Sequence, residues 1–98
     1  MATVIWLADT EDTMFRELPA GELAPFSAYK LAGVVLEDDP NEIFRMLNLW
    51  DRPADFILAK GVDAVRSLSV GDILHRESGG MLIVARDEFR HIKFDYTK

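Results

Sequence analysis

The sequence predicts a small α+β domain, in which an antiparallel sheet ends in a C-terminal three-stranded meander and carries two or three short helices. Three observations predict it. Apolar, β-prone runs at residues 2–7 and 29–36 have the length of strands. A helix-start signal follows the second run, at Asp39-Pro40. The last third alternates short apolar runs with turn residues. A chain of 98 residues has room for one domain, so we expect a single unit over residues 1–98.

The N-terminal third is expected to hold two strands joined by a short helix. Residues 2–7 are rich in Val, Ile and Trp, as buried strands are. Thr10 is a candidate N-cap for a helix over residues 10–18, because Glu and Asp follow it where carboxylates face the positive end of the helix dipole. Residues 23–27 are expected to form a loop. Residues 29–36 form the second predicted strand.

The strongest local signal is Asp39-Pro40-Asn41-Glu42. Asp39 is a good N-cap, Pro40 suits the first helical position, and Glu42 completes a capping-box-like pair. The apolar residues that follow at helical spacing should face the core: Ile43, Phe44, Met46, Leu47 and Trp50. A second short helix is predicted from Asp51 and Pro53 through Leu58, with Gly61 as its stop.

The last third predicts three antiparallel strands, over residues 68–75, 81–86 and 89–94. Ser78-Gly79 and Asp87-Glu88 are the expected turns between them. Residues 81–85 are apolar without alternation, so the middle strand should be covered on both faces.

Charge and composition exclude several classes of protein. The net charge is −6, and the acidic excess lies in residues 1–55, where Lys and Arg do not cluster as nucleic-acid backbone binding requires. No apolar run approaches the roughly twenty residues of a membrane-spanning helix. No basic residue precedes the N-terminal apolar run, so a secretory signal is not expected and a cytoplasmic location is. The absence of Cys excludes disulfides and thiolate metal sites.

The two histidines are the sharpest candidates for enzymatic chemistry. Two-residue turns would pair His75 with Leu82 and His91 with Val84, which places both imidazoles on one face but about 12 Å apart. One metal ion cannot bridge that distance, so no metal and no cofactor is predicted. The motifs of phosphate-binding loops, dinucleotide-binding turns, zinc-binding helices and serine nucleophile elbows are absent.

We therefore expect a protein that is not an enzyme, with two alternatives. One is a small metal- or ligand-dependent enzyme that uses His75 and His91. The other is a weak nucleic-acid-binding accessory module, whose cations would share one sheet edge: Arg66, Arg76, Arg86, Arg90 and Lys93.

The run Arg66-Ser67-Leu68-Ser69-Val70-Gly71-Asp72, together with residues 41–48 and the step Arg52-Pro53-Ala54-Asp55-Phe56, resembles the YodL-like family. In that family a short helix ending near an asparagine is followed by a Pro-x-x-aromatic step and an Arg-Ser-Leu-Ser-Val-Gly-Asp signature. The resemblance covers about two-thirds of the chain, with residues 57–65 longer than the usual spacing. It implies an accessory or interaction module of plasmids, conjugative elements and phages, without catalytic residues.

The signature also has a physical interpretation of its own. Gly71-Asp72 suits a tight turn into a strand, in which Ser67 or Ser69 bonds local backbone groups. Arg66 is available to pair with Asp72 or Asp63. These roles are structural rather than catalytic.

Together these observations predict a non-enzymatic binding or inhibitor protein of phage or plasmid origin, which occupies a host or element-encoded protein through an acidic surface. Anti-defence activity, such as anti-CRISPR activity by nucleic-acid mimicry, belongs to this hypothesis. The expected contact residues are carboxylates of the acidic half: Glu37, Asp38, Asp39, Glu42, Asp51 and Asp55. The protein is expected to be a monomer or a weak homodimer.

Overall fold

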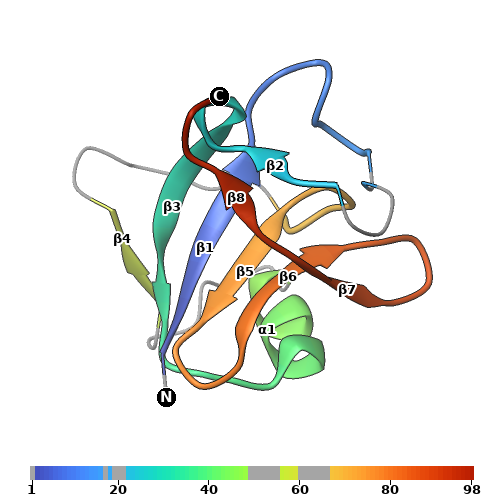
Figure 1. The fold of residues 1–98 in the computed structure, drawn as a ribbon. Coiled ribbons are helices and arrows are strands. Elements are labelled where there is room, and N and C mark those ends of the chain that lie inside the picture. The colour runs from blue at the N-terminus through green and yellow to red at the C-terminus, as the bar shows by residue number, and fades with distance from the viewer. Residues whose placement is uncertain (1, 17, 19–21, 49–55, 60–66) are drawn as a thin grey trace.

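A six-stranded antiparallel sheet, in the order β4-β3-β1-β5-β6-β7, organises the chain (Figure 1). The computed structural model describes residues 2–16, 18, 22–48, 56–59 and 67–98. The strands are β1 (Thr3–Ala8), β3 (Tyr29–Val35), β4 (Phe56–Leu58), β5 (Ile73–Arg76), β6 (Gly80–Val84) and β7 (Phe89–Ile92). Two shorter strands, β2 (Ala24–Pro25) and β8 (Phe94–Asp95), pair in parallel as a second sheet, and the 3-10 turn η1 (Phe26–Ala28) follows β2.

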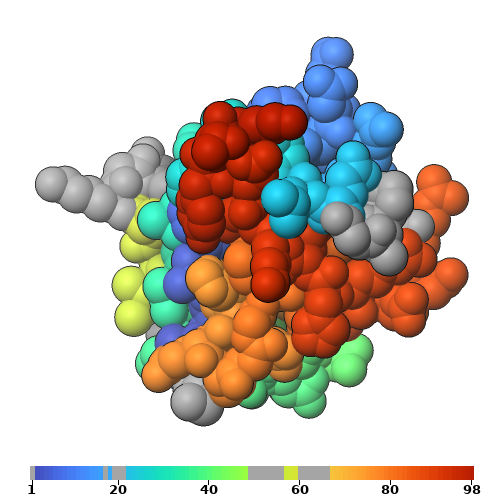
Figure 2. All heavy atoms as spheres, in the orientation of Figure 1, coloured from blue at the N-terminus to red at the C-terminus, as the bar shows by residue number. Residues whose placement is uncertain are grey.

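The main sheet is covered on both faces. The helix α1 (Pro40–Leu47) lies against one face, and β2, η1 and β8 cross the other (Figure 1). Figure 2 shows the chain's last residues, in red, covering the upper part of that second face. Because both faces are buried, Ile73 and its neighbour Leu74 are each fully buried although they point in opposite directions.

Each face has its own core. The aromatic core lies under β2 and β8, and its rings, those of Trp6, Phe26, Tyr29 and Phe94, are joined by Tyr96 with centroids 5.0–5.8 Å apart. The helix core lies under α1, where Ile43 is fully buried beside Ile5 and Val35. In the aromatic core most ring pairs meet edge to face, an arrangement that the quadrupoles of aromatic rings favour.

The prediction of an α+β domain with two or three helices is wrong. The molecule is mostly antiparallel sheet, and α1 is the one α-helix in the described ranges. Residues 10–15 form a single turn instead of a helix, in which the Met14 amide donates to the Thr10 carbonyl at 2.9 Å. Phe15 then adopts φ +59°, a left-handed conformation that ends helical geometry.

The second predicted helix is also wrong over the part that the structure describes. Residues 56–58 form β4, whose Ile57 pairs with Val34 of β3. A short apolar run is compatible with a strand or with a helix, and here its pairing with the edge of β3 favours the strand. Asp51 and Pro53, the predicted start of that helix, lie outside the described residues.

The first helical signal is confirmed at its N-terminus. Asp39 is the N-cap, and its Oδ1 accepts from the Asn41 amide at 2.9 Å, while Pro40 opens α1. The carboxylate of Glu42 accepts from Arg45 rather than completing a capping box. Ile43 is buried and its apolar neighbours Phe44, Met46 and Leu47 are partly buried, whereas Trp50 lies outside the described residues.

The C-terminal meander of three antiparallel strands is confirmed, with a different register. Arg76 pairs with Gly80 across a three-residue turn, and Gly80, the residue that follows the turn, has φ +80°, a left-handed conformation that glycine adopts readily. His75 therefore pairs with Met81, one residue from the predicted partner, and His91 pairs with Leu82. The middle strand is buried on both faces from Met81 onward, as expected.

The signature run forms a tight turn into β5, as predicted. The Asp72 amide donates to the Ser69 carbonyl at 3.1 Å, and the Ser69 hydroxyl donates to the Ser67 carbonyl at 3.3 Å. The fully buried Asp72 carboxylate accepts from the amides of Ala8 at 2.9 Å and Ser69 at 2.8 Å. The turn is thereby fastened to the end of β1; Arg66 lies outside the described residues.

Gly71 explains why the turn needs glycine. It has φ +98°, and a Cβ at this position would lie 2.5 Å from the Thr13 carbonyl oxygen. The turn at residues 10–15 therefore packs directly on the signature, and this close approach is a structural role for the motif.

Candidate functional site

Carboxylates gather at the end of the molecule where α1 begins. We call this group the acidic end: Glu37, Asp38, Asp39, Glu42 and Glu77. Two distant segments meet there, because the Thr3 hydroxyl donates to the Glu37 carbonyl at 2.7 Å while the Ala2 amide donates to the Glu77 carboxylate at 3.1 Å. The Ser78 hydroxyl also bonds the Asp38 carboxylate, although the two residues are 40 positions apart.

Most bonds to these carboxylates come from neutral groups. Glu37 Oε2 accepts from the amides of Asp38 at 2.8 Å and Asp39 at 3.2 Å, and Asp39 accepts from the amide of Asn41. Such bonds orient a carboxylate without cancelling its charge. Glu42 differs, because its hydrogen bond with Arg45 lowers its pKa below the usual value.

The structure thus brings together four of the predicted contact residues: Glu37, Asp38, Asp39 and Glu42. Asp51 and Asp55 lie outside the described residues. Glu77 was missed by the sequence reasoning. It lies in the turn after β5, and only the pairing of Thr3 with Arg76 carries that turn beside the start of β1.

The histidines do not form a common site. Met81 and Leu82 are adjacent on β6 and point to opposite faces, so their partners His75 and His91 also lie on opposite faces. The expectation that both imidazoles share a face is therefore wrong. Across the described ranges, no group of three or more His, Cys, Asp or Glu side chains could hold a metal ion.

The cations also fail to share one sheet edge. Arg76 closes β5 and donates to the Gly79 carbonyl at 2.9 Å, whereas Arg86 follows the opposite end of β6. Arg90 and Lys93 lie on and just after the edge strand β7. Arg66 lies outside the described residues, so the predicted nucleic-acid edge is not assembled by those that are described.

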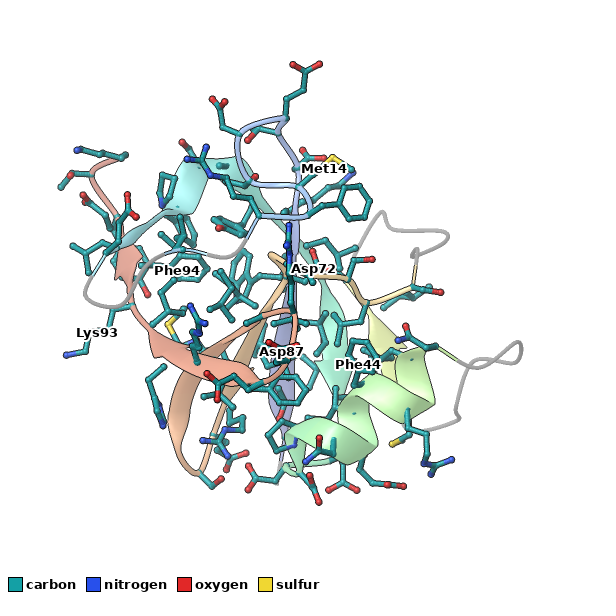
Figure 3. All side chains as sticks on the ribbon, turned by 90° about the vertical axis from the view of Figure 1, so that its right-hand side faces the viewer. Met14, Phe44, Asp72, Asp87, Lys93 and Phe94 are labelled. Carbon is teal, nitrogen blue, oxygen red and sulfur yellow. The ribbon has the colours of Figure 1, made fainter. Side chains whose placement is uncertain are left out.

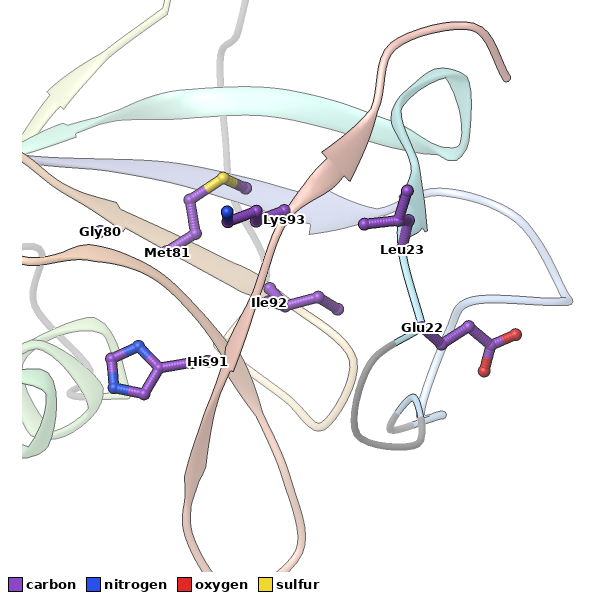
Figure 4. A pocket seen from close by; sticks show the side chains of 7 residues that line it. All are labelled: Glu22, Leu23, Gly80, Met81, His91, Ile92 and Lys93. Atoms are coloured by element: carbon purple, nitrogen blue, oxygen red, sulfur yellow. The ribbon is translucent and has the colours of Figure 1, made fainter.

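A groove of about 530 Å³ lies beside the end of β7 (Figure 4). It is lined by residues from three parts of the chain: Glu22, Leu23, Gly80, Met81, His91, Ile92 and Lys93. In Figure 4 the side chain of Leu23 points toward the chain at Lys93, between β7 and β8, while the carboxylate of Glu22 points away from it. Half of the Leu23 surface is exposed (50%), so the groove has an apolar wall open to solvent.

Scans against protein-family models, curated proteins and solved structures return no match, so the resemblance to the YodL-like family stays an expectation. Among the described residues, no helix has the length and apolarity that crossing a bilayer demands.

Proposed function

We propose that this chain is a non-enzymatic binding protein whose acidic end occupies a basic surface of a partner protein. The observation that carries the proposal is the meeting of residues 37–42 with the turn at Glu77 and Ser78. Charges from two segments then act as one surface, which raises the rate of encounter with a surface of opposite charge.

The charge balance of this surface supports the proposal. The acidic end has five carboxylates, and the cations placed by bonds in the same region are Arg45, on Glu42, and Arg76, on the Gly79 carbonyl. At physiological salt the screening length is about 8 Å, so charges closer to one another than this act jointly on a partner. A basic partner would therefore meet a net negative surface.

The narrower form of the proposal concerns the partner. Carboxylates presented in a row can replace phosphates in a basic nucleic-acid-binding groove, so a cytoplasmic nucleic-acid-handling or defence protein of a host is the partner class that fits. An origin in a phage or plasmid, and anti-defence activity, depend on the resemblance noted in the sequence.

The experiment compares two pairs of neutralising substitutions in a pull-down from host lysate. The test variant is Asp38→Asn with Glu77→Gln, because the new amide oxygens can still accept from the Ser78 hydroxyl and the Ala2 amide. The control is Glu11→Gln with Asp12→Asn, which makes the same charge change in the exposed turn at the other end of β1 (Figure 1).

The expected result is a captured partner that elutes at lower salt from the test variant and at unchanged salt from the control. Nucleic acid added to the lysate should compete for the same partner. Equal behaviour of the two variants would show that net charge acts without a defined surface, and the proposal would fail.

A further inference from the structure

The outer edge of β7 has no strand beside it among the described residues. The strand is the last in the order of the main sheet and pairs through residues 89–92 with β6 alone. In Figure 1 it lies at the right of the sheet, and Figure 3, seen from that side, shows it running across the front of the molecule. Such an edge presents unpaired backbone groups to a partner.

The hydrogen-bond pattern identifies which backbone groups face outward. The Ala85 amide donates to the Glu88 carbonyl at 2.9 Å, which makes these two residues a hydrogen-bonded pair. Bonded and non-bonded pairs alternate along an antiparallel ladder. Arg90 and Ile92 therefore bond inward to β6, and the N–H and C=O groups of Phe89 and His91 point away from the sheet.

The groove begins where this free edge ends. Ile92 and Met81 are buried at its base, with 8% and 9% of their surfaces exposed, and Leu23 forms the opposite wall. Lys93 is exposed at the rim. The groove therefore offers apolar surface and one cation directly in line with the unpaired backbone.

Charge argues against a second copy of this chain as the added strand. Antiparallel self-pairing in which both outward residues, Phe89 and His91, form hydrogen-bonded pairs is centred on Arg90 and sets that residue opposite itself. Like charges directly opposite each other destabilise a strand pair, and each copy also has a net charge of −6. A segment with an acidic side chain has the complementary charge.

We propose that β7 accepts an extended segment of a partner protein as a further strand, with an apolar side chain of the segment in the groove and an acidic one beside Lys93. Backbone bonds to Phe89 and His91 give affinity in this mode, and the groove and the cation give specificity. The inference goes beyond the acidic end, which lies on different elements, and can hold or fail independently of it.

The experiment uses random peptides displayed on phage, selected against the full chain and then measured on three variants. His91→Pro removes an N–H that faces outward, which an edge strand tolerates, whereas an inward position would not. His91→Thr removes the same imidazole but keeps the N–H, so it is the matched control. Lys93→Glu reverses the charge at the rim, and thermal melts check that each variant is folded.

The expected result is a set of peptides with alternating apolar residues and at least one acidic residue. Their affinity should fall at least about tenfold on His91→Pro, which corresponds to about 1.4 kcal/mol. It should stay within about twofold on His91→Thr, a change below about 0.5 kcal/mol. On Lys93→Glu the preference should turn toward basic peptides.

Two results would overturn the proposal. One is selected peptides that bind a folded His91→Pro variant as well as the natural chain, which would assign the groove to side-chain binding alone. The other is a selection on the natural chain that enriches no peptide beyond what the same selection on a folded His91→Pro variant enriches. Neutralising Asp38 and Glu77 should leave the affinity for the selected peptides unchanged. This control tests the β7 proposal separately from the proposal for the acidic end.

Discussion

Tyr29→Phe should stabilise this protein, although Tyr29 lies in the aromatic core. The side chain is 7% exposed, its ring centroid lies 5.6 Å from that of Phe94, and its hydroxyl has no hydrogen-bond partner among the described residues. A buried hydroxyl without a partner costs about 1–3 kcal/mol of desolvation. Removing the oxygen while keeping the ring should raise the free energy of unfolding by about 1–2 kcal/mol near pH 7.

The same hydroxyl predicts a dependence on alkaline pH. Burial, with a further contribution from the negative charge of Asp72, raises the pKa of Tyr29 from 10.0 to about 12. Below pH 10 the phenol is neutral in both the folded and the unfolded chain. Between pH 10 and 12 the unfolded chain ionises first, so stability is lost as the pH rises. The advantage of Tyr29→Phe should therefore widen by about 2 kcal/mol over that window.

Guanidinium unfolding of both proteins at a series of pH values measures this difference. Tyr96→Phe is the control, because Tyr96 is 67% exposed and the same chemical change should have little effect there. A Tyr29→Phe variant that is less stable at pH 7 would show that the hydroxyl has a partner in solution. A gap that stays constant from pH 10 to 12 would refute the raised pKa.

Three further substitutions test how the turns are held. Gly71→Ala should cost about 3 kcal/mol, because its positive φ is strained for alanine and the new methyl would press on the Thr13 carbonyl; a thermal melt measures the loss. Asp72→Asn should lower the free energy of unfolding by about 2 kcal/mol, because the amide side chain has one oxygen and can accept only one of the two bonds; hydrogen exchange at the Ala8 amide should become faster. Asp39→Ala should cost about 1 kcal/mol through the lost cap, measured by denaturant unfolding, and Asp39→Asn should restore most of it.

Each of these has an opposing outcome. A melt unchanged by Gly71→Ala would mean that the turn at residues 10–15 does not rest on the signature in solution. Unaltered hydrogen exchange at the Ala8 amide in Asp72→Asn would show that the Asp72 carboxylate does not hold the end of β1 in solution. Equal stabilities of Asp39→Ala and Asp39→Asn would show that the N-cap bond of Asp39 does not contribute to the stability of α1.

The sequence predicted those elements whose signals are local. The start of α1 follows from Asp39 and Pro40 alone, because an N-cap and a preset φ act within one turn. The buried middle strand β6 follows from its continuous apolar run. In each case the residues that decide the structure are neighbours in the chain.

The predicted helix at residues 10–18 failed because distant contacts decide its conformation. Thr13 is only 3% exposed, and its hydroxyl lies 3.2 Å from the Thr10 carbonyl and 3.4 Å from the Ala28 carbonyl. That position closes a turn against the end of η1 and competes with a continuing helix. The approach of Gly71 to the same turn is equally invisible in a local window.

The candidate sites show the same division. Three adjacent carboxylates, Glu37 to Asp39, were visible in the sequence, but their meeting with Glu77 required the pairing of β1 with β5. The histidines were assigned to one face because the first hairpin was given a two-residue turn. One added turn residue, compensated by the left-handed Gly80, reverses the face.

The central place of β1 has a consequence for how the chain reaches this structure. The strand pairs with β3 on one side and with β5 on the other, and its last amide is held by a carboxylate 64 residues further along. Its neighbours must therefore be brought in across long loops before the sheet can close, and topologies with such distant contacts fold in roughly milliseconds to seconds. Until β5 arrives, the side of β1 that it will cover stays open to other chains. We expect refolding yield to fall as protein concentration rises, because aggregation competes with this slow closure.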